Sequence, residues 1–171
     1  MKNIFTAFIL IAFVGASNAD DFTQLGVSYT DYDVNGFSAD SIDIGYGQQN
    51  GKLRYGINVG RLDAGGSSET AWSTGIDYGF GDWEAGTFYV GLGYTDSGSS
   101  DGDGIYDVGY RRSSSSGTNY YISIVDCFDD CGDQTIAAGV SFDVGSGNWL
   151  GLGYATEDDV DAIQISYNKK W

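Results

Sequence analysis

Large apolar side chains alternate with glycine or small polar residues along most of the chain. Residues 90–94, VGLGY, place a large apolar side chain at every second position, and residues 150–154, LGLGY, repeat the pattern almost unchanged. A period of two puts alternate side chains on opposite faces of a β-strand. The alternation recurs in ten segments, at 25–30, 42–47, 53–60, 72–80, 87–94, 106–111, 120–124, 135–144, 150–154 and 163–168. The pattern therefore predicts an all-β, antiparallel chain of ten strands, with eight as the alternative.

Each segment has one bulky apolar face and one face of glycine, small polar or charged residues. A soluble barrel or sandwich buries the bulky face, whereas a transmembrane barrel turns it toward lipid and keeps a polar lumen. The links favour the second arrangement. Short links are expected near Gly51, Gly81, Ser115 and Gly147, and mostly longer, Asp-rich links at 32–39, 63–69, 95–104, 127–133 and 156–161. Alternating short and long links are typical of an up-and-down transmembrane β-barrel. A secreted soluble β-sandwich is the less favoured interpretation.

The N-terminus has the three parts of a secretory signal peptide. Lys2 supplies a basic start, an apolar run extends over 4–14, and residues 17–19, SNA, form a small-residue cleavage site. The apolar run is shorter than the roughly 20 residues of a transmembrane helix. We therefore expect cleavage after Ala19 and a single exported domain over 20–171.

The C-terminus ends in an aromatic residue that follows an alternating apolar run. Ile163, Ile165 and Tyr167 occupy alternate positions before Trp171. Here the chain resembles the small bacterial outer-membrane β-barrel proteins, which are OmpA/OmpX-like or porin-like. The resemblance implies an integral barrel in the bacterial outer membrane, with outer-membrane lipid and lipopolysaccharide around it. It also implies that the barrel-assembly machinery reads these four residues as an assembly signal. Lys169 departs from the family, which usually has an aromatic or apolar residue there.

The chain is strongly acidic, with 24 Asp and Glu against 8 Lys and Arg and a formal net charge of −16. Such a surface repels nucleic acid and attracts cations, so divalent cations are candidate partners. We favour solvated carboxylates over a metal site, because no link carries a complete ligand set. The nearest calcium candidate, formed by Asp96, Asp101 and Asp103, lacks the distant bidentate Glu. No cofactor is expected.

The two cysteines, Cys127 and Cys131, frame the short segment CFDDC in one of the expected longer links. An exported chain with an even number of cysteines favours a disulfide. A metal site is the alternative, but two Cys without His provide only half of a zinc site. We expect the disulfide, which would fix the tip of this link.

The chain contains no histidine. Outer-membrane barrels that are enzymes resemble one another in depending on a histidine, and a serine nucleophile without one needs another base in a fixed setting. The sequence therefore predicts a protein that is not an enzyme.

The predicted lumen carries charged residues of both signs. On the assigned strand faces, the inward-pointing charges are Asp43, Arg54, Asp77, Asp107, Arg111 and Asp143. Opposite charges inside a barrel pair across strands, so we favour a structural or surface-interaction role. The alternative is a narrow, cation-preferring channel, because Asp outnumbers Arg. Lumen glycines such as Gly91 are expected to leave space that large neighbours such as Tyr89 cover.

Overall fold

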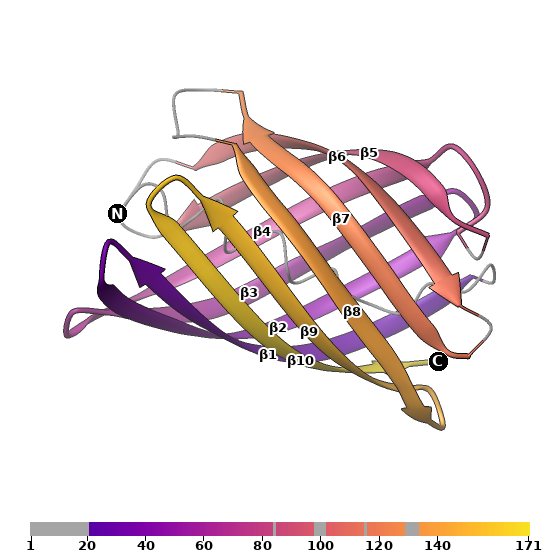
Figure 1. Ribbon diagram of the computed structural model, residues 1–171, viewed down its shortest axis with the longest axis horizontal. Helices are drawn as coiled ribbons and strands as arrows, with labels where there is room; N and C mark the ends of the chain where they lie inside the picture. The colour runs from indigo at the N-terminus through magenta and orange to yellow at the C-terminus, as the bar shows by residue number, and fades with distance from the viewer. Residues whose placement is uncertain (1–20, 84, 98–101, 115, 129–133) are drawn as a thin grey trace.

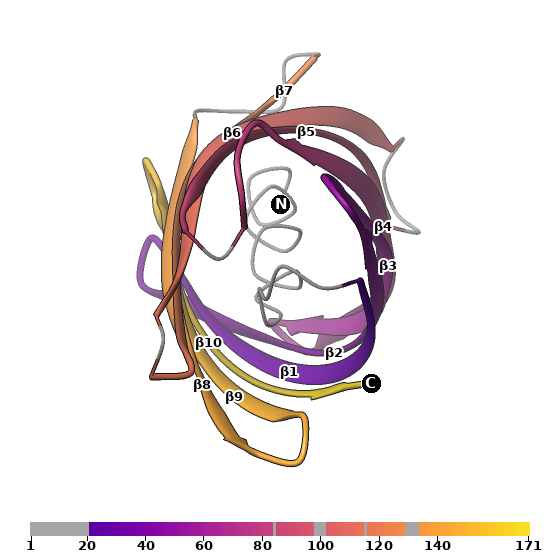
Figure 2. The same ribbon diagram turned by 90° about the vertical axis from the view of Figure 1, so that its right-hand side faces the viewer.

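A computed structural model describes residues 21–83, 85–97, 102–114, 116–128 and 134–171. Within these residues ten antiparallel strands form, and every strand pairs with its chain neighbours while β10 pairs with β1, which closes the barrel (Figures 1 and 2). The strands are β1 (Phe22–Val34), β2 (Phe37–Asn50), β3 (Leu53–Ala64), β4 (Ser67–Gly79), β5 (Thr87–Ser97), β6 (Asp103–Ser114), β7 (Thr118–Cys127), β8 (Thr135–Gly145), β9 (Asn148–Glu157) and β10 (Val160–Lys170). The predicted ten-stranded up-and-down barrel is confirmed.

The pairing register is staggered around the barrel. The row of paired residues that starts at Phe22 on β1 crosses all the strands and reaches Val160 on β10, whose partner on β1 is Val34. The row thus returns to β1 near its opposite end. Such a shear requires strands tilted by roughly 35–45° to the barrel axis, and the steep tilt is visible in Figure 1.

The two ends of the barrel differ in their links. One end, here called the terminal end, carries the start of β1, the C-terminus and the links 51–52, 80–86, 115–117 and 146–147. Trp171 closes this end through two backbone hydrogen bonds of 3.0 Å with Thr23. The opposite end, the far end, carries the links 35–36, 65–66, 98–102, 128–134 and 158–159.

The links at the far end are mostly shorter than the sequence predicts. Asn35 and Gly36 have φ of 54° and 81°, and Gly65 and Gly66 have φ of 57° and 87°, so both pairs form two-residue turns with the twist of a hairpin. The strands also continue to 157 and from 160. The longer loops expected at 32–39, 63–69 and 156–161 are therefore wrong. Asp residues interrupt the apolar alternation in these segments, so the pattern predicts that the strands end earlier than they do.

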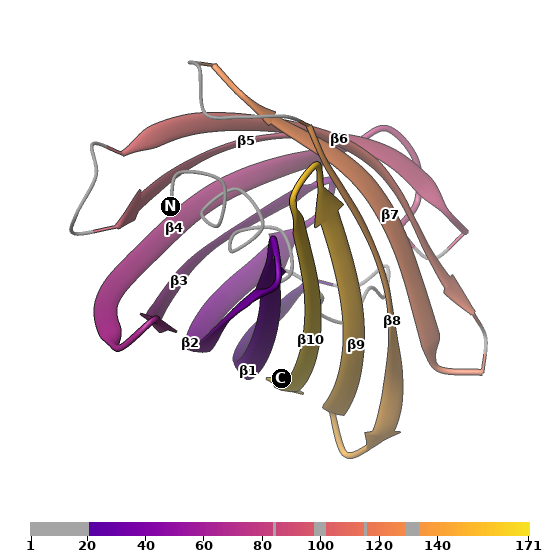
Figure 3. The same ribbon diagram turned by 60° about the vertical axis from the view of Figure 1, so that its left-hand side comes forward.

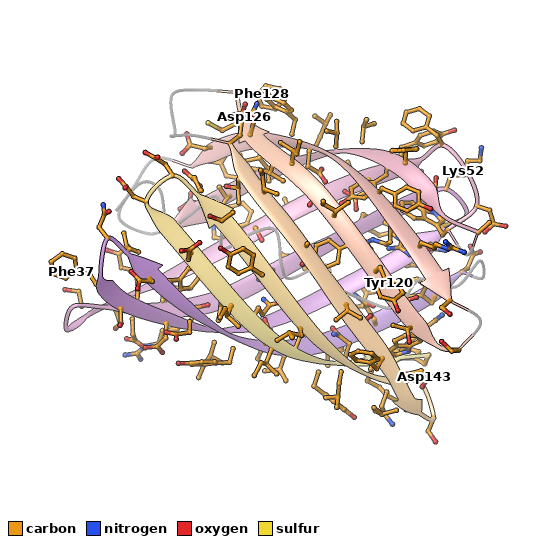
Figure 4. All side chains as sticks on the ribbon, viewed as in Figure 1. Phe37, Lys52, Tyr120, Asp126, Phe128 and Asp143 are labelled. Atoms are coloured by element: carbon orange, nitrogen blue, oxygen red, sulfur yellow. The ribbon has the colours of Figure 1, made fainter. Side chains whose placement is uncertain are left out.

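The outer surface is apolar and the interior contains most of the polar side chains. Every strand contributes exposed aliphatic or aromatic side chains to the outside, such as Ile44, Ile57, Leu92, Ile122, Leu152 and Ile165. The buried polar side chains face inward and include Asp43, Arg54, Asn58, Arg111, Asn119 and Gln164. This is the reverse of a soluble barrel. Figure 3 shows the strands that form the wall, and Figure 4 adds the side chains that the wall carries.

Glycines on the inner face make room for large neighbours on the adjacent strand. The ring of Tyr89 lies over Gly109, where an added Cβ would sit 2.5 Å from Tyr89 Cζ. The ring of Tyr121 covers Gly139 so closely that an added Cβ would overlap it. These large side chains therefore need glycine as their cross-strand neighbour.

Candidate functional site: the barrel lumen

Two acidic and two basic side chains meet inside the barrel toward the terminal end. Arg54 on β3 is the register partner of Asp77 on β4, and Asp77 and Asp107 are the partners of Gly91 on β5 from its two sides. Because Gly91 has no side chain, both carboxylates reach over it: an added Cβ would lie 2.6 Å from Asp77 Oδ1 and would overlap Asp107. Arg111 on β6 completes this group of four residues, the charged cluster. The formal charges of the two Asp and the two Arg in the charged cluster cancel.

Aromatic rings hold both arginines of the charged cluster. The Arg54 guanidinium carbon lies 4.1 Å from the ring centre of Trp83 and 5.6 Å from that of Phe22. Arg54 Nε also donates a 2.7 Å hydrogen bond to Gln49 Oε1. The guanidinium carbon of Arg111 lies 5.5 Å from the ring centre of Tyr89. Cation–π contacts of this kind stabilise a partly desolvated cation by about 0.5–2 kcal/mol.

Trp83 is a site residue that the sequence does not reveal. It belongs to the link between β4 and β5 yet is only 3% exposed, and its Nε1 donates a 3.1 Å hydrogen bond to the carbonyl of Gly51. Its ring lies over Gly79, where an added Cβ would be 2.7 Å from the ring. The link thus folds inward and places an aromatic ring in the mouth of the barrel. The sequence predicts a short link near Gly81, whereas the link spans 80–86 and leaves room for Trp83 to turn inward.

Little free space remains beside the charged cluster. A cavity of about 40 Å³ is lined by residues that include Asp77, Tyr89, Asp107 and Arg111, and a second, of about 10 Å³, lies beside Phe22 and Arg54. One buried water needs roughly 10–15 Å³ of such volume, so these two spaces have room for only a few waters. Beside the cluster, the described side chains thus occupy most of the lumen.

The other two predicted lumen charges lie apart from the cluster. Asp43 is inside the barrel, 2% exposed, and accepts a 2.9 Å hydrogen bond from Ser41 Oγ. Asp143 is exposed at the terminal end of β8 (Figure 4), where its register partner is the buried Trp149. Asp143 thus keeps the face that the sequence assigns to it but lies at the rim of the barrel, next to the register shift that follows at Gly145.

The lumen toward the far end has an apolar wall. Ala137, Ala155, Ala162, Tyr32 and Ala39 follow one another in register across β8, β9, β10, β1 and β2, and all five are buried. Leu62, Ala71 and Val160 pack in the same cluster. We call this group the alanine wall. The sequence analysis predicts a polar lumen and so misses it, although alanine at inward positions of several strands could have indicated an apolar region.

The predicted assembly-signal residues occupy the closing strand. Ile163, Ile165 and Tyr167 are exposed on the outer face of β10, and Trp171 follows the strand at the terminal end. The Tyr167 hydroxyl donates a 2.7 Å hydrogen bond to Asn148 Oδ1 on β9. Recognition of these residues by an assembly machinery stays a prediction.

The disulfide and calcium predictions fall partly on undescribed residues. Cys127 is buried at the end of β7, whereas Cys131 lies outside the described residues, so their pairing stays a prediction. Asp101 likewise lies outside them, while Asp96 and Asp103 stand at the facing ends of β5 and β6. In the part of the chain that the structure describes, no group of three or more His, Cys, Asp or Glu could hold a metal ion.

The outer surface has the layers of a membrane-spanning barrel. Tyrosines border the aliphatic band, and two near the far end donate to carboxylates: Tyr154 to Asp161 at 2.5 Å and Tyr106 to Asp126 at 3.0 Å. An outward apolar band with aromatic borders and a closed ladder of backbone hydrogen bonds define a transmembrane β-barrel. The described residues include no helix with the length and hydropathy of a membrane span.

Comparisons with known proteins agree with this fold. No protein-family model matches the chain, and no curated protein matches it in sequence. The KdgM porin in complex with disordered oligogalacturonate is 8% identical, with a TM-score of 0.51 over 85% of this chain and 98% of that one. Neisserial surface protein A is 15% identical, with a TM-score of 0.41 over 91% and 97%. The chain thus has the fold of the small outer-membrane β-barrel proteins.

A porin with a longer chain is also among the similar structures. A mutant porin of Rh. blastica is 19% identical, with a TM-score of 0.42 over 87% of this chain and 51% of the porin. The chain therefore spans about half the length of that porin.

Proposed function

We propose that this protein is a non-enzymatic, integral barrel of the bacterial outer membrane, with a structural or surface-interaction role and a lumen closed at its terminal end. The observation that carries the proposal is the charged cluster with its covering rings. The Arg54 guanidinium lies over the rings of Phe22 and Trp83, and that of Arg111 lies over Tyr89. Beside them the described residues line cavities of about 40 and 10 Å³. The terminal end is then the periplasmic one, and residues 1–19 are the cleaved signal peptide.

The placement of the inward charges argues against the cation-preferring channel. Within the cluster two Asp face two Arg, and Asp143 is exposed at the terminal end of β8. Two further inward carboxylates are buried and hydrogen-bonded by hydroxyls: Asp43 accepts from Ser41, and Glu157 accepts from Thr135. Carboxylates held in the wall in this way do not form an open charged row along which a cation could pass.

Planar-bilayer recording tests this proposal. The purified wild-type barrel should show no stable conductance, whereas Trp83→Ala together with Arg54→Ala should produce discrete conductance steps by removing the plug. Trp72→Ala, which changes an outward-facing ring, is the matched control and should stay silent. A stable cation-selective conductance of the wild type would establish the channel instead.

Membrane location is tested independently. The protein should be recovered with outer membranes and should migrate faster in an unheated SDS gel than in a heated one. N-terminal sequencing should begin at Asp20. Recovery as a soluble protein from the medium would favour the secreted β-sandwich.

Lipopolysaccharide and divalent cations are the proposed partners of the far end, which is then extracellular. Asp31, Asp40 and Asp63 are direct register partners on the outer face of β1, β2 and β3. Like charges directly opposite each other destabilise a sheet, and cations that bridge them to lipid phosphates would remove this repulsion. In vesicles containing lipopolysaccharide, Mg²⁺ should raise the melting temperature of the barrel, and EDTA should lower it.

The Cys127–Cys131 disulfide belongs to the same extracellular end. It should appear as a 2 Da mass difference between the oxidised and reduced protein, about the mass of the two hydrogens lost on oxidation. Labelling of two thiols in the unfolded, unreduced protein would exclude it.

A further inference from the structure

The outer wall over β7 to β10 is hollowed rather than smooth. A mostly apolar groove of about 500 Å³ runs across these strands. Its outward-facing lining residues are Tyr120, Ala138, Val140, Leu152, Tyr154 and Ile163. Figure 4 shows Tyr120 on this wall, which the strands β7, β8 and β9 form. The groove is shallow and open to its surroundings, so an occupant would lie along it rather than inside it.

The groove exists because one small side chain stands in a row of large ones. Ala138 lies in register between Ile122 on β7 and Tyr154 on β9, and Ile163 follows on β10. Ile122, Tyr154 and Ile163 are all exposed on the outer face. The missing side-chain volume at Ala138 therefore leaves a hollow between its neighbours.

Something must fill this hollow in the membrane, because apolar walls without partner atoms lose their dispersion contacts. A second copy of the chain is a poor fit. A two-fold interface brings the same patch of both copies together, so two concave surfaces would face each other. A flexible acyl chain follows a concave wall, and it is the material that surrounds this band.

Charge at the groove's two borders orients the lipid. Arg112 on β6 is exposed and is the register partner of Tyr120, at the terminal end of the groove. At the far end Tyr154 is bound to the carboxylate of Asp161. A phosphate is attracted to the guanidinium and repelled by the carboxylate, so the headgroup belongs at Arg112.

We propose that this groove retains one phospholipid of the periplasmic leaflet, with an acyl chain over Ala138 and its phosphate at Arg112. The proposal rests on the membrane location proposed above. The groove would then be a specific phospholipid-binding site on the outer apolar surface of the barrel.

Native mass spectrometry of the barrel, purified from bacterial membranes in a mild detergent, tests the site. The wild type should carry one phospholipid. Ala138→Phe fills the groove and should shift the spectrum to the lipid-free barrel, while Arg112→Ala should lower the occupied fraction. Val108→Phe, an equally outward change on β6 outside the groove, should keep the lipid.

Three results would overturn the site. These are equal lipid retention by wild type and Ala138→Phe, a mass of lipid A in place of phospholipid, and a wild-type dimer that Ala138→Phe dissociates. All three variants change outward side chains, so the heat-modifiable gel shift should confirm that they fold. Absence of that shift in the wild type would instead refute the membrane proposal, which keeps the two failures distinguishable.

Discussion

Two regions of the lumen solve the problem of filling a narrow barrel in opposite ways. The charged cluster places long side chains next to glycine, as Asp77 and Asp107 do over Gly91. The alanine wall instead places mainly small, apolar side chains in register on neighbouring strands, such as Ala137, Ala155 and Ala162. One region gains specificity from charge pairing and hydrogen bonds, and the other excludes polar groups.

The difference has an energetic consequence. In the cluster, each charge is tolerated because a side chain of opposite charge or an aromatic ring lies beside it. Removal of one of these neighbours leaves a charge inside the barrel without compensation. In the alanine wall the polar side-chain atom is the Tyr32 hydroxyl, which lies 3.4 Å from Ser41 Oγ. The other side chains are apolar, so the sensitive property of the wall is apolarity itself. The two regions should therefore respond to different substitutions.

Removal of one cluster carboxylate should have the largest effect. Asp77→Ala leaves Asp107 as the one carboxylate that faces Arg54 and Arg111. We expect the free energy of unfolding to fall by about 3 kcal/mol, near the lower end of the cost of removing one of two opposite charges inside a protein. Urea unfolding in lipid vesicles measures it. Asp63→Ala, on the exposed outer face beside Arg61, is the matched control and should change little. Equal losses would show that the cluster is not specially coupled.

A methyl group on an inner glycine should have the next largest effect. Gly139→Ala forces its Cβ into the ring of Tyr121 and should cost about 1–3 kcal/mol. Gly47→Ala, whose nearest atom is the flexible Gln24 Nε2 at 3.3 Å, should be milder. In the Tyr121→Ala background, where the ring is absent, Gly139→Ala should cost less than it does in the wild type. An equal cost in both backgrounds would remove the packing explanation.

A hydroxyl in the alanine wall should cost less. Ala155→Ser adds a polar group to a fully buried apolar position, and we expect a loss of about 1–2 kcal/mol. The reverse change elsewhere in the lumen, Ser73→Ala, removes a buried hydroxyl that has no hydrogen-bond partner and should be neutral or stabilising. If the wall accepts Ser without loss, it does not act as an apolar region.

The smallest effect belongs to the outer face. Asp40→Asn removes the middle carboxylate of three register partners and should stabilise the barrel by about 0.2–1 kcal/mol. High salt should cancel the gain, since exposed charges are screened. A gain that persists in high salt would point to another cause.

Most of the fold and only part of the site could be predicted. The alternation in segments such as 90–94 predicts strands, and it places Arg54, Asp77, Asp107 and Arg111 on the inner face. It does not predict that these four meet, because the meeting depends on the register and on the gap above Gly91. The alternation does not predict the inward position of Trp83, because it assigns an inner or outer face only to residues within strands.

The sequence by itself determined the strands and their two faces, because period-two alternation is a local property of the chain. The tertiary structure alone decided the shear, the two-residue turns at the far end, the inward fold of Trp83 and the groove at Ala138. Each of these arises from which strands stand side by side and at what offset. That information lies in long-range pairing, which neither composition nor periodicity contains.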